Sequence, residues 1–241
     1  MSLQEYRLRI KFSVPKDERY PNEDSHQCSK RRGIFALSDG ASVSYDSALW
    51  SRILVRHYCI RPEIDQQWLT GAIAEFSRIH NRDSLPWMMQ AAFDRGSFAS
   101  LLGVRYEQGG TGVQVFAVGD SLAVLCEGDK VVDSWPYKDA SQFARDPQLI
   151  STNPEDNNFL FQEETQQRFK VNWDLVGMSA PAVFCMTDAL GCWLLARRDE
   201  APSPVTTLRS LSKRREFGEF VRSEHDAGRL KRDDTTVLGF W

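Results

Sequence analysis

Aspartate follows an apolar segment at three separate places in this sequence. The segments IFALS, VFAVG and VFCMT each end in one small residue, and the next residue is Asp39, Asp120 or Asp188. A fourth segment, TTVLGF, begins directly after Asp233 and Asp234. If the fourth segment runs antiparallel to the others in a sheet, its beginning lies at the same edge as their ends. A single aspartate here is more often a turn or capping residue, so the repetition is what predicts one shared site.

Carboxylates that meet at one edge need a positive partner. They repel one another and raise one another's pKa unless cations neutralise them. None of these motifs has a histidine or cysteine beside its aspartate. Ligand sets made only of oxygen suit hard cations such as Mg²⁺ or Mn²⁺ rather than zinc or copper. The sequence therefore predicts a site for divalent metal.

The apolar periodicity predicts an α+β fold in one domain that spans residues 1–241. Strands and helices come in separate blocks, which favours this class over a parallel βαβ sheet, and 241 residues suffice for one large core. The polar stretch 15–32 reads as a loop, and the short apolar runs between residues 98 and 132 read as an antiparallel meander. We expect further strands at 6–14, 34–37, 182–186 and 235–240, and helices at 47–59, at 68–80, and in parts of 190–196 and 205–227.

Composition and charge narrow the classes of partner and compartment. The net charge of −3 gives no general attraction to nucleic acid. Five cysteines without a CxxC pair predict reduced residues in a cytoplasmic protein. The longest apolar region, 175–196, is interrupted by Pro181 and Asp188, so we expect no membrane span, and residues 1–12 lack the apolar stretch of a secretory signal.

Five short motifs, taken in order, resemble those of the type 2C family of metal-dependent serine/threonine protein phosphatases, in its short bacterial form. The resemblance spans about residues 6 to 241, and five ordered motifs are far more specific than one. It implies a four-layer α-β-β-α sandwich, in which two antiparallel sheets are flanked by helices. The motifs are RYPNEDSH (19–26), SDGAS (38–42), VGDSLAVL (118–125), MTDAL (186–190) and RDDTTVL (232–238).

The resemblance also implies a role for each site residue. Asp39 would bridge two Mn²⁺ or Mg²⁺ ions and position the nucleophilic water between them. Arg19 would grip the phosphate with its planar fork. By residue type alone Arg19, Glu23 and Asp24 read as solvated surface, and the motif is what reverses this interpretation. The metal ligands would be Glu23, Asp24, Asp39, the carbonyl of Gly40, Asp188 and Asp233, with Asp120 helping to hold a third, looser ion.

The implied function is hydrolysis of phosphoserine and phosphothreonine in proteins, opposing a serine/threonine kinase. Two alternatives stay open: a phosphatase-fold module that binds phosphoproteins with weak or no catalysis, and a phosphatase of small metabolites. Ala41 stands where many eukaryotic members carry a general-acid histidine, so the leaving group must take its proton from water or elsewhere. The region 133–174 falls where the family carries a variable flap. Neither the physiological substrate nor the oligomeric state follows from the sequence.

Overall fold

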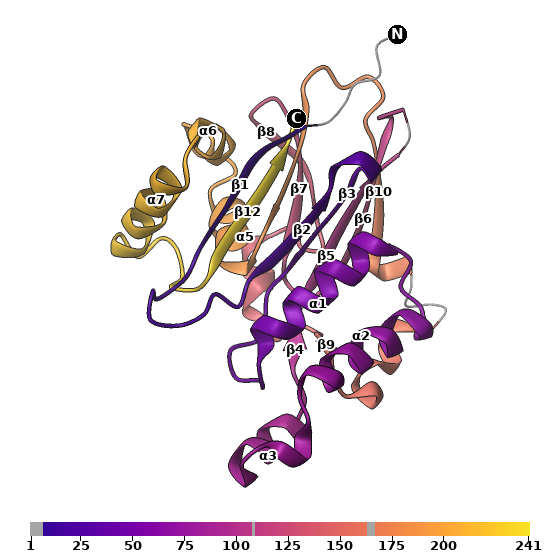
Figure 1. Cartoon of the computed structure of the whole chain (residues 1–241). Coiled ribbons are helices and arrows are strands. Elements are labelled where there is room, and N and C mark those ends of the chain that lie inside the picture. The colour runs from indigo at the N-terminus through magenta and orange to yellow at the C-terminus, as the bar shows by residue number, and fades with distance from the viewer. Residues whose placement is uncertain (1–6, 108, 163–166) are drawn as a thin grey trace.

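Two five-stranded antiparallel sheets face each other in the computed structural model, which describes residues 7–107, 109–162 and 167–241 (Figure 1). The first predicted strand is confirmed from Leu8 onward, whereas Tyr6 lies outside the described residues. One sheet has the order β1 (Leu8–Val14), β12 (Thr235–Phe240), β11 (Pro181–Met186), β7 (Leu122–Glu127), β8 (Lys130–Trp135), and the other β10 (Lys170–Asp174), β6 (Gly112–Val118), β5 (Leu101–Tyr106), β3 (Ile34–Ser38), β2 (Ser25–Ser29).

Side chains that alternate along each strand fill different layers of the core. In β3, Phe35 and Leu37 pack between the two sheets, whereas Ile34 and Ala36 pack against the helices outside. Because both faces of the strand are covered, its sequence is continuously apolar rather than alternating. In β11, Ala182, Phe184 and Met186 pack against the outer helices, whereas Val183 and Cys185 pack between the sheets. The run AVFCM is therefore also continuously apolar.

Helices cover both outer faces and complete the four layers that the sequence predicted. Asp46 begins the helix that packs on β2 and β3, and Asp65 begins the helix that packs on that one; the two aspartates accept hydrogen bonds from Leu49 N and Trp68 N. Figure 1 shows these helices on one side of the sheets and the C-terminal helices on the other. The first group is α1 (Ser47–Ile60), α2 (Gln66–Ile79) and the projecting α3 (Trp87–Asp94), and the second is α5 (Asp188–Ala196), α6 (Pro204–Ser210) and α7 (Arg214–Asp226).

Three expectations about local structure were wrong. The predicted loop 15–32 contains β2, because its polar residues pair through the backbone with β3 at the sheet edge. The predicted single meander is divided, because β6 and β7 follow each other in sequence yet belong to opposite sheets. The predicted strand at 98–104 splits into β4 (Phe98–Ala99), which pairs with β9 (Ile150–Ser151), and β5. Helix α3 was not predicted, and its Trp87 is exposed.

The region 133–174 contains more structure than a polar loop. Between the end of β8 and β10 it forms three short 3₁₀ helices, of which Ala140–Ala144 and Pro154–Leu160 are the longer, while residues 163–166 lie outside the described part. All five cysteines are free. None of the helices within the described ranges is long and apolar enough to cross a membrane.

Candidate metal centre

The last two strands along the chain bring two of the predicted ligands together. Strands β11 and β12 are antiparallel, with Met186 opposite Val237. Asp188 is the first residue of α5, just past the end of β11, and Asp233 lies just before β12 begins. The end of one strand therefore meets the beginning of the other, as the sequence predicted.

The opposite sheet supplies the other carboxylates. Asp24 directly precedes β2, and Asp39 directly follows β3. Since Ser25 and Ser38 are paired across these antiparallel strands, the two aspartates lie at the same end. Asp120 lies in the turn that leads from β6 across to β7. The carboxylates thus come from both sheets rather than from one.

The electrostatics indicate that these groups lie close together. Burial raises the pKa of Asp39 well above its ordinary value, and the carboxylates of Asp24, Asp188, Asp120 and Asp233 raise it further. Burial is also the main cause that raises the pKa of Asp24, with neighbouring aspartates adding to it. The pKa of Asp120 rises to about 6 through burial and the charge of Asp188. The cluster therefore holds more negative charge than its surroundings can solvate.

Two lysines supply positive charge to the cluster. The Nζ of Lys231 lies 3.0 Å from Oδ2 of Asp188 and 2.9 Å from Oδ2 of Asp233. The Nζ of Lys16 lies 2.7 Å from Oε2 of Glu23 and 3.9 Å from Oδ1 of Asp233. The two ammonium groups therefore partly neutralise these carboxylates.

The donor atoms nevertheless fit a hard cation. Oδ1 of Asp24 and Oδ1 of Asp188 are buried and have no hydrogen-bond partner in the described part of the chain. A buried carboxylate oxygen without a partner is costly, and a Mg²⁺ or Mn²⁺ ion would satisfy it. Across the described ranges no three His, Cys, Asp or Glu side chains already surround one point as ligands. Binding would therefore require the carboxylates to exchange their lysine partners for metal.

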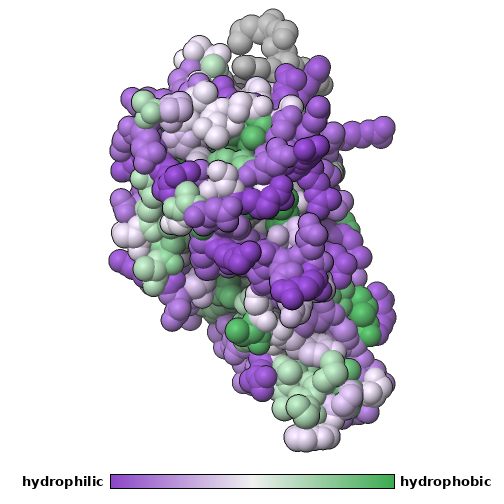
Figure 2. Space-filling model, turned by 90° about the vertical axis from the view of Figure 1, so that its left-hand side faces the viewer, coloured by the Kyte–Doolittle hydropathy of each residue, from purple (hydrophilic) through white to green (hydrophobic). Residues whose placement is uncertain are grey.

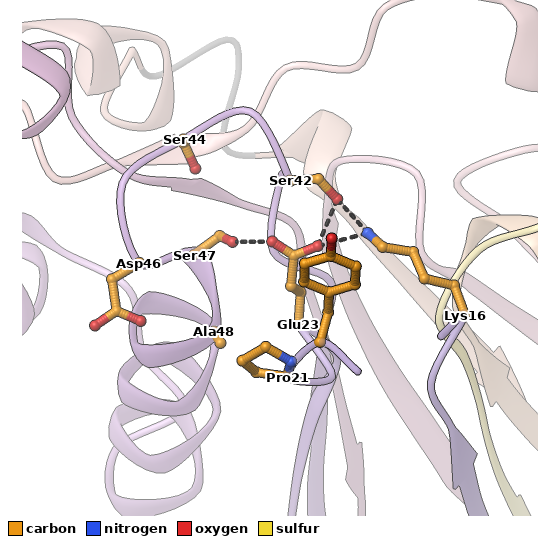
Figure 3. A pocket seen from close by; sticks show the side chains of 9 residues that line it. Lys16, Pro21, Glu23, Ser42, Ser44, Asp46, Ser47 and Ala48 are labelled. Atoms are coloured by element: carbon orange, nitrogen blue, oxygen red, sulfur yellow. Dashed lines mark hydrogen bonds and ion pairs between the residues drawn. The ribbon is translucent and has the colours of Figure 1, made fainter. Parts of the chain in front are cut away.

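Glu23 is held on the wall of a neighbouring pocket of about 370 Å³. Figure 3 shows Lys16, Ser42 and Ser47 converging on its carboxylate from three segments. Ser47 Oγ donates to Oε1 at 2.6 Å, while Ser42 Oγ and Lys16 Nζ donate to Oε2 at 2.5 and 2.7 Å. Both oxygens have partners, so Glu23 ties the segment that follows β1, the 39–44 turn and α1 together.

The backbone after β3 is equally constrained. Asp39 N donates to Ser100 Oγ at 3.0 Å, and Ser100 N donates to Asp39 O at 2.8 Å. A Cβ at Gly40 would lie 2.7 Å from the carbonyl oxygen of Ser47, closer than packing permits. Glycine is therefore required where the chain passes the beginning of α1, and this fixes Asp39 against β5.

Arg19 points elsewhere in this structure. Its side chain is 81% exposed and pairs with Asp17, with Nη2 2.6 Å from Oδ2. It lies beside a basic groove along α7 rather than among the carboxylates. Arg19 is thus not brought to the cluster, and Glu23 reaches it only through Lys16, whose Nζ lies 3.9 Å from Oδ1 of Asp233.

Lys16 and Lys231, which contact the carboxylates, were not predicted, whereas Asp234 was expected at this edge but was not assigned as a ligand. Lys16 and Lys231 have no motif signal, although each is within three residues of a charged cluster in the sequence. Asp234 is only 2% exposed and accepts hydrogen bonds from Lys16 N at 2.7 Å and Glu23 N at 2.6 Å. The pair Asp233–Asp234 marked this position, but only the structure separates the surface-facing carboxylate from the buried one.

Comparison with known proteins identifies the fold. No protein-family model and no curated protein matches the sequence. Among solved structures, a bacterial serine phosphatase superposes with a TM-score of 0.61 at 11% identity, covering 97% of each chain. The catalytic domain of the serine/threonine phosphatase PstP, in complex with two manganese ions, gives 0.58 at 14% identity over 98% of this chain and 97% of its own. PppA of Pseudomonas aeruginosa, a key regulatory component of the T6SS, gives 0.53 at 17% over 99% and 98%. The expected sandwich of the serine/threonine phosphatases is therefore confirmed.

Proposed function

We propose that this chain is a metal-dependent phosphatase that hydrolyses phosphoserine and phosphothreonine in proteins. The observation that carries the proposal is the cluster of buried, mutually repelling aspartates at one end of the paired sheets. Perturbed carboxylates in such a cluster are typical of functional sites. The shared fold with serine/threonine phosphatases adds the reaction class by analogy.

The proposed ligands are the residues that the motifs single out. Asp39, the Gly40 carbonyl, Asp188 and Asp233 would hold two Mn²⁺ or Mg²⁺ ions, with Glu23 and Asp24 beside them. Asp120 would contribute to a third ion, which its pKa of about 6 supports, because a cation would relieve its repulsion. Such ions, when bound, supply a nucleophile at neutral pH by lowering the pKa of a bridging water.

The chain's own groups would position the substrate. Arg19 would turn from Asp17 to the phosphate, since an exposed arginine–aspartate pair is weakly held and phosphate accepts the same bidentate fork. The backbone of Asp39 is fixed by its hydrogen bonds with Ser100, and this would hold the Asp39 carboxylate in position to orient the attacking water. Ala41 cannot donate a proton, so solvent would protonate the leaving serine or threonine oxygen.

The proposed setting is reversible phosphorylation in the cytoplasm, where the enzyme would oppose a serine/threonine kinase. Five free cysteines support a reducing compartment. The comparison with PppA, a regulatory component, supports a role in signalling by analogy alone.

The direct test is hydrolysis of p-nitrophenyl phosphate with Mn²⁺, with EDTA, and with Asp39→Asn. We expect activity that needs the metal and falls at least about a hundredfold in the variant. Asp199→Asn, at a side chain that is 94% exposed, is the matched control and keeps wild-type activity. Full activity in EDTA would refute the proposal. A panel of phosphopeptides and phosphorylated metabolites then separates a protein phosphatase from a metabolite phosphatase, and calorimetry without any cation binding would favour a binding module.

A further inference from the structure

A wide groove of about 870 Å³ runs between α7 and the segment that follows β1. Phe217 of α7 stacks on Phe12 of β1 with ring centroids 5.6 Å apart, which anchors the helix to the sheet. Arg214, Gly218, Arg222 and His225 follow at intervals of three or four residues, so they share one face of the helix. This face forms one wall of the groove, and residues 14–19 form the other.

The groove is strongly basic although the whole chain has a net charge of −3. Figure 2 views the molecule from the side of α6 and α7, and hydrophilic residues predominate on this face. Of the 13 described residues that line the groove, two are acidic and six are lysine or arginine. The six are Lys16, Arg19, Arg214, Arg215, Arg222 and Arg232.

Several of these donors are available for a ligand. Arg222 and Arg232 are exposed and form no hydrogen bond or ion pair with another residue in the described ranges. Among the described residues, Arg19 is engaged only by its neighbour Asp17. An arrangement of unpaired guanidinium groups is suited to carboxylates and phosphates.

The groove begins beside the carboxylate cluster. Arg232 directly precedes Asp233, and Lys16 lines the groove while pairing with Glu23. From Arg214 to Arg222 the helix rises about 12 Å. An extended peptide covers that distance with about four residues. A chain bound at the cluster could therefore continue along α7.

We infer that this groove binds an acidic segment next to the phosphorylated residue of the protein substrate. The inference rests on the proposed phosphatase function and adds a substrate class to it. Glutamate, aspartate or a second phosphorylated residue on the segment that continues along α7 would pair with Arg222 and its neighbours. Single-stranded nucleic acid fits less well, because none of the lining residues is a Trp, Tyr or Phe on which a base could stack.

The test compares two phosphothreonine peptides of equal length, one with glutamates and one with glutamines at the flanking positions. Arg222→Glu is expected to lower kcat/KM for the glutamate peptide about tenfold, while p-nitrophenyl phosphate and the glutamine peptide change less than about twofold. Arg222→Lys should retain most of the preference. Arg78→Glu, the same change on the exposed face of α2, is the matched control. The wild-type preference should shrink as salt is added, because exposed charges are screened.

The inference would be overturned if Arg222→Glu lowered kcat/KM equally for the glutamate and glutamine peptides, or lowered it for neither. Fluorescence anisotropy of the labelled glutamate peptide in EDTA separates this outcome from failure of the proposed function. Tighter binding to wild type than to Arg222→Glu supports the groove even if every phosphatase assay is negative. Equal binding to the two proteins, or preferred binding of a single-stranded oligonucleotide, rules it out.

Discussion

The ammonium of Lys231 lies 3.0 Å from Oδ2 of Asp188, an oxygen that the proposed function assigns to metal. The same nitrogen lies 2.9 Å from Oδ2 of Asp233, so it joins the end of β11 to the beginning of β12. Asp188 keeps its other oxygen, Oδ1, buried and unpaired. The carboxylates that would bind a cation are thus partly neutralised by the chain itself, and a metal ion would have to compete with this lysine.

Replacing Lys231 with glutamine should therefore tighten Mn²⁺ binding. We expect the dissociation constant from calorimetry to fall roughly three- to tenfold. This change corresponds to the free energy of one or two partly exposed ion pairs, which the metal would no longer have to break. Lys130→Gln, on the exposed hairpin between β7 and β8, should leave it unchanged. Weaker binding in K231Q would mean that Lys231 orients the ligands rather than competing for them.

The metal-free protein should lose stability as the pH rises from about 4 through 6. The pKa of Asp120 is raised from 3.8 to about 6, and those of Asp24 and Asp39 are raised as well, so the folded state keeps protons that the unfolded chain releases. The pKa values of Glu23, Glu224, His26 and His57 are lowered, so these groups add stability as the pH rises and make the net fall smaller.

Calorimetry in EDTA between pH 4.5 and 7.5 measures this effect. We expect the melting temperature to fall by roughly 5 °C over that range, and less in Asp120→Asn. Saturating Mn²⁺ should raise the melting temperature again at neutral pH, because the ion would bind the ionised carboxylates. A melting temperature that rises steadily with pH in EDTA would contradict the assigned direction.

Ser47 and Glu23 should be energetically coupled. Ser47 is 3% exposed, and its hydroxyl donates to a Glu23 oxygen at 2.6 Å. Ser47→Ala is expected to cost about 1.5–3 kcal/mol in urea unfolding, since the acceptor is charged. In a double-mutant cycle with Glu23→Gln the coupling should be about 1 kcal/mol or more. Additive single effects would argue against the bond, and Ser223→Ala on the exposed side of α7 is the neutral control.

Gly103 in β5 should not tolerate a side chain. A Cβ at this position would overlap the ring of Tyr58, which is 1% exposed in α1. Gly103→Ala is expected to destabilise the protein by about 3 kcal/mol or more, because neither the strand nor the helix can move freely. Combining it with Tyr58→Ala should cost less than the two single changes together.

A second glycine serves as the control for this prediction. Gly71 is exposed in α2, where a Cβ would meet only His57 at 3.7 Å. Gly71→Ala should be neutral or stabilising by up to about 1 kcal/mol, since alanine favours helix more than glycine does. If Gly103→Ala behaved like Gly71→Ala in urea, the close packing of β5 on α1 would be disproved.

Much of the fold could be predicted from local patterns. Strand β12 begins and ends where the apolar run TTVLGF does, and α1 begins after the capping residue Asp46. Errors arose where pairing depends on distant partners. The turn at Gly119–Ser121 looks like a hairpin, yet it carries the chain from one sheet to the other. Strand β2 is polar because it lies at a sheet edge, so periodicity gave no sign of it.

The sequence by itself determined where the aspartates stand along the chain, because each follows or precedes a segment whose apolar residues fix it as a buried strand. Only the tertiary structure decided how their charge is balanced. Lys231 reaches Asp188 across 43 positions in sequence, and Arg19 turns away from the cluster to Asp17. The basic groove likewise joins α7 to a segment about 200 residues earlier. The contact of Lys231 and the groove follow from the pairing of β1, β12 and β11 in one sheet and from the packing of α7 on that sheet. Local periodicity carries no information about which distant strands pair.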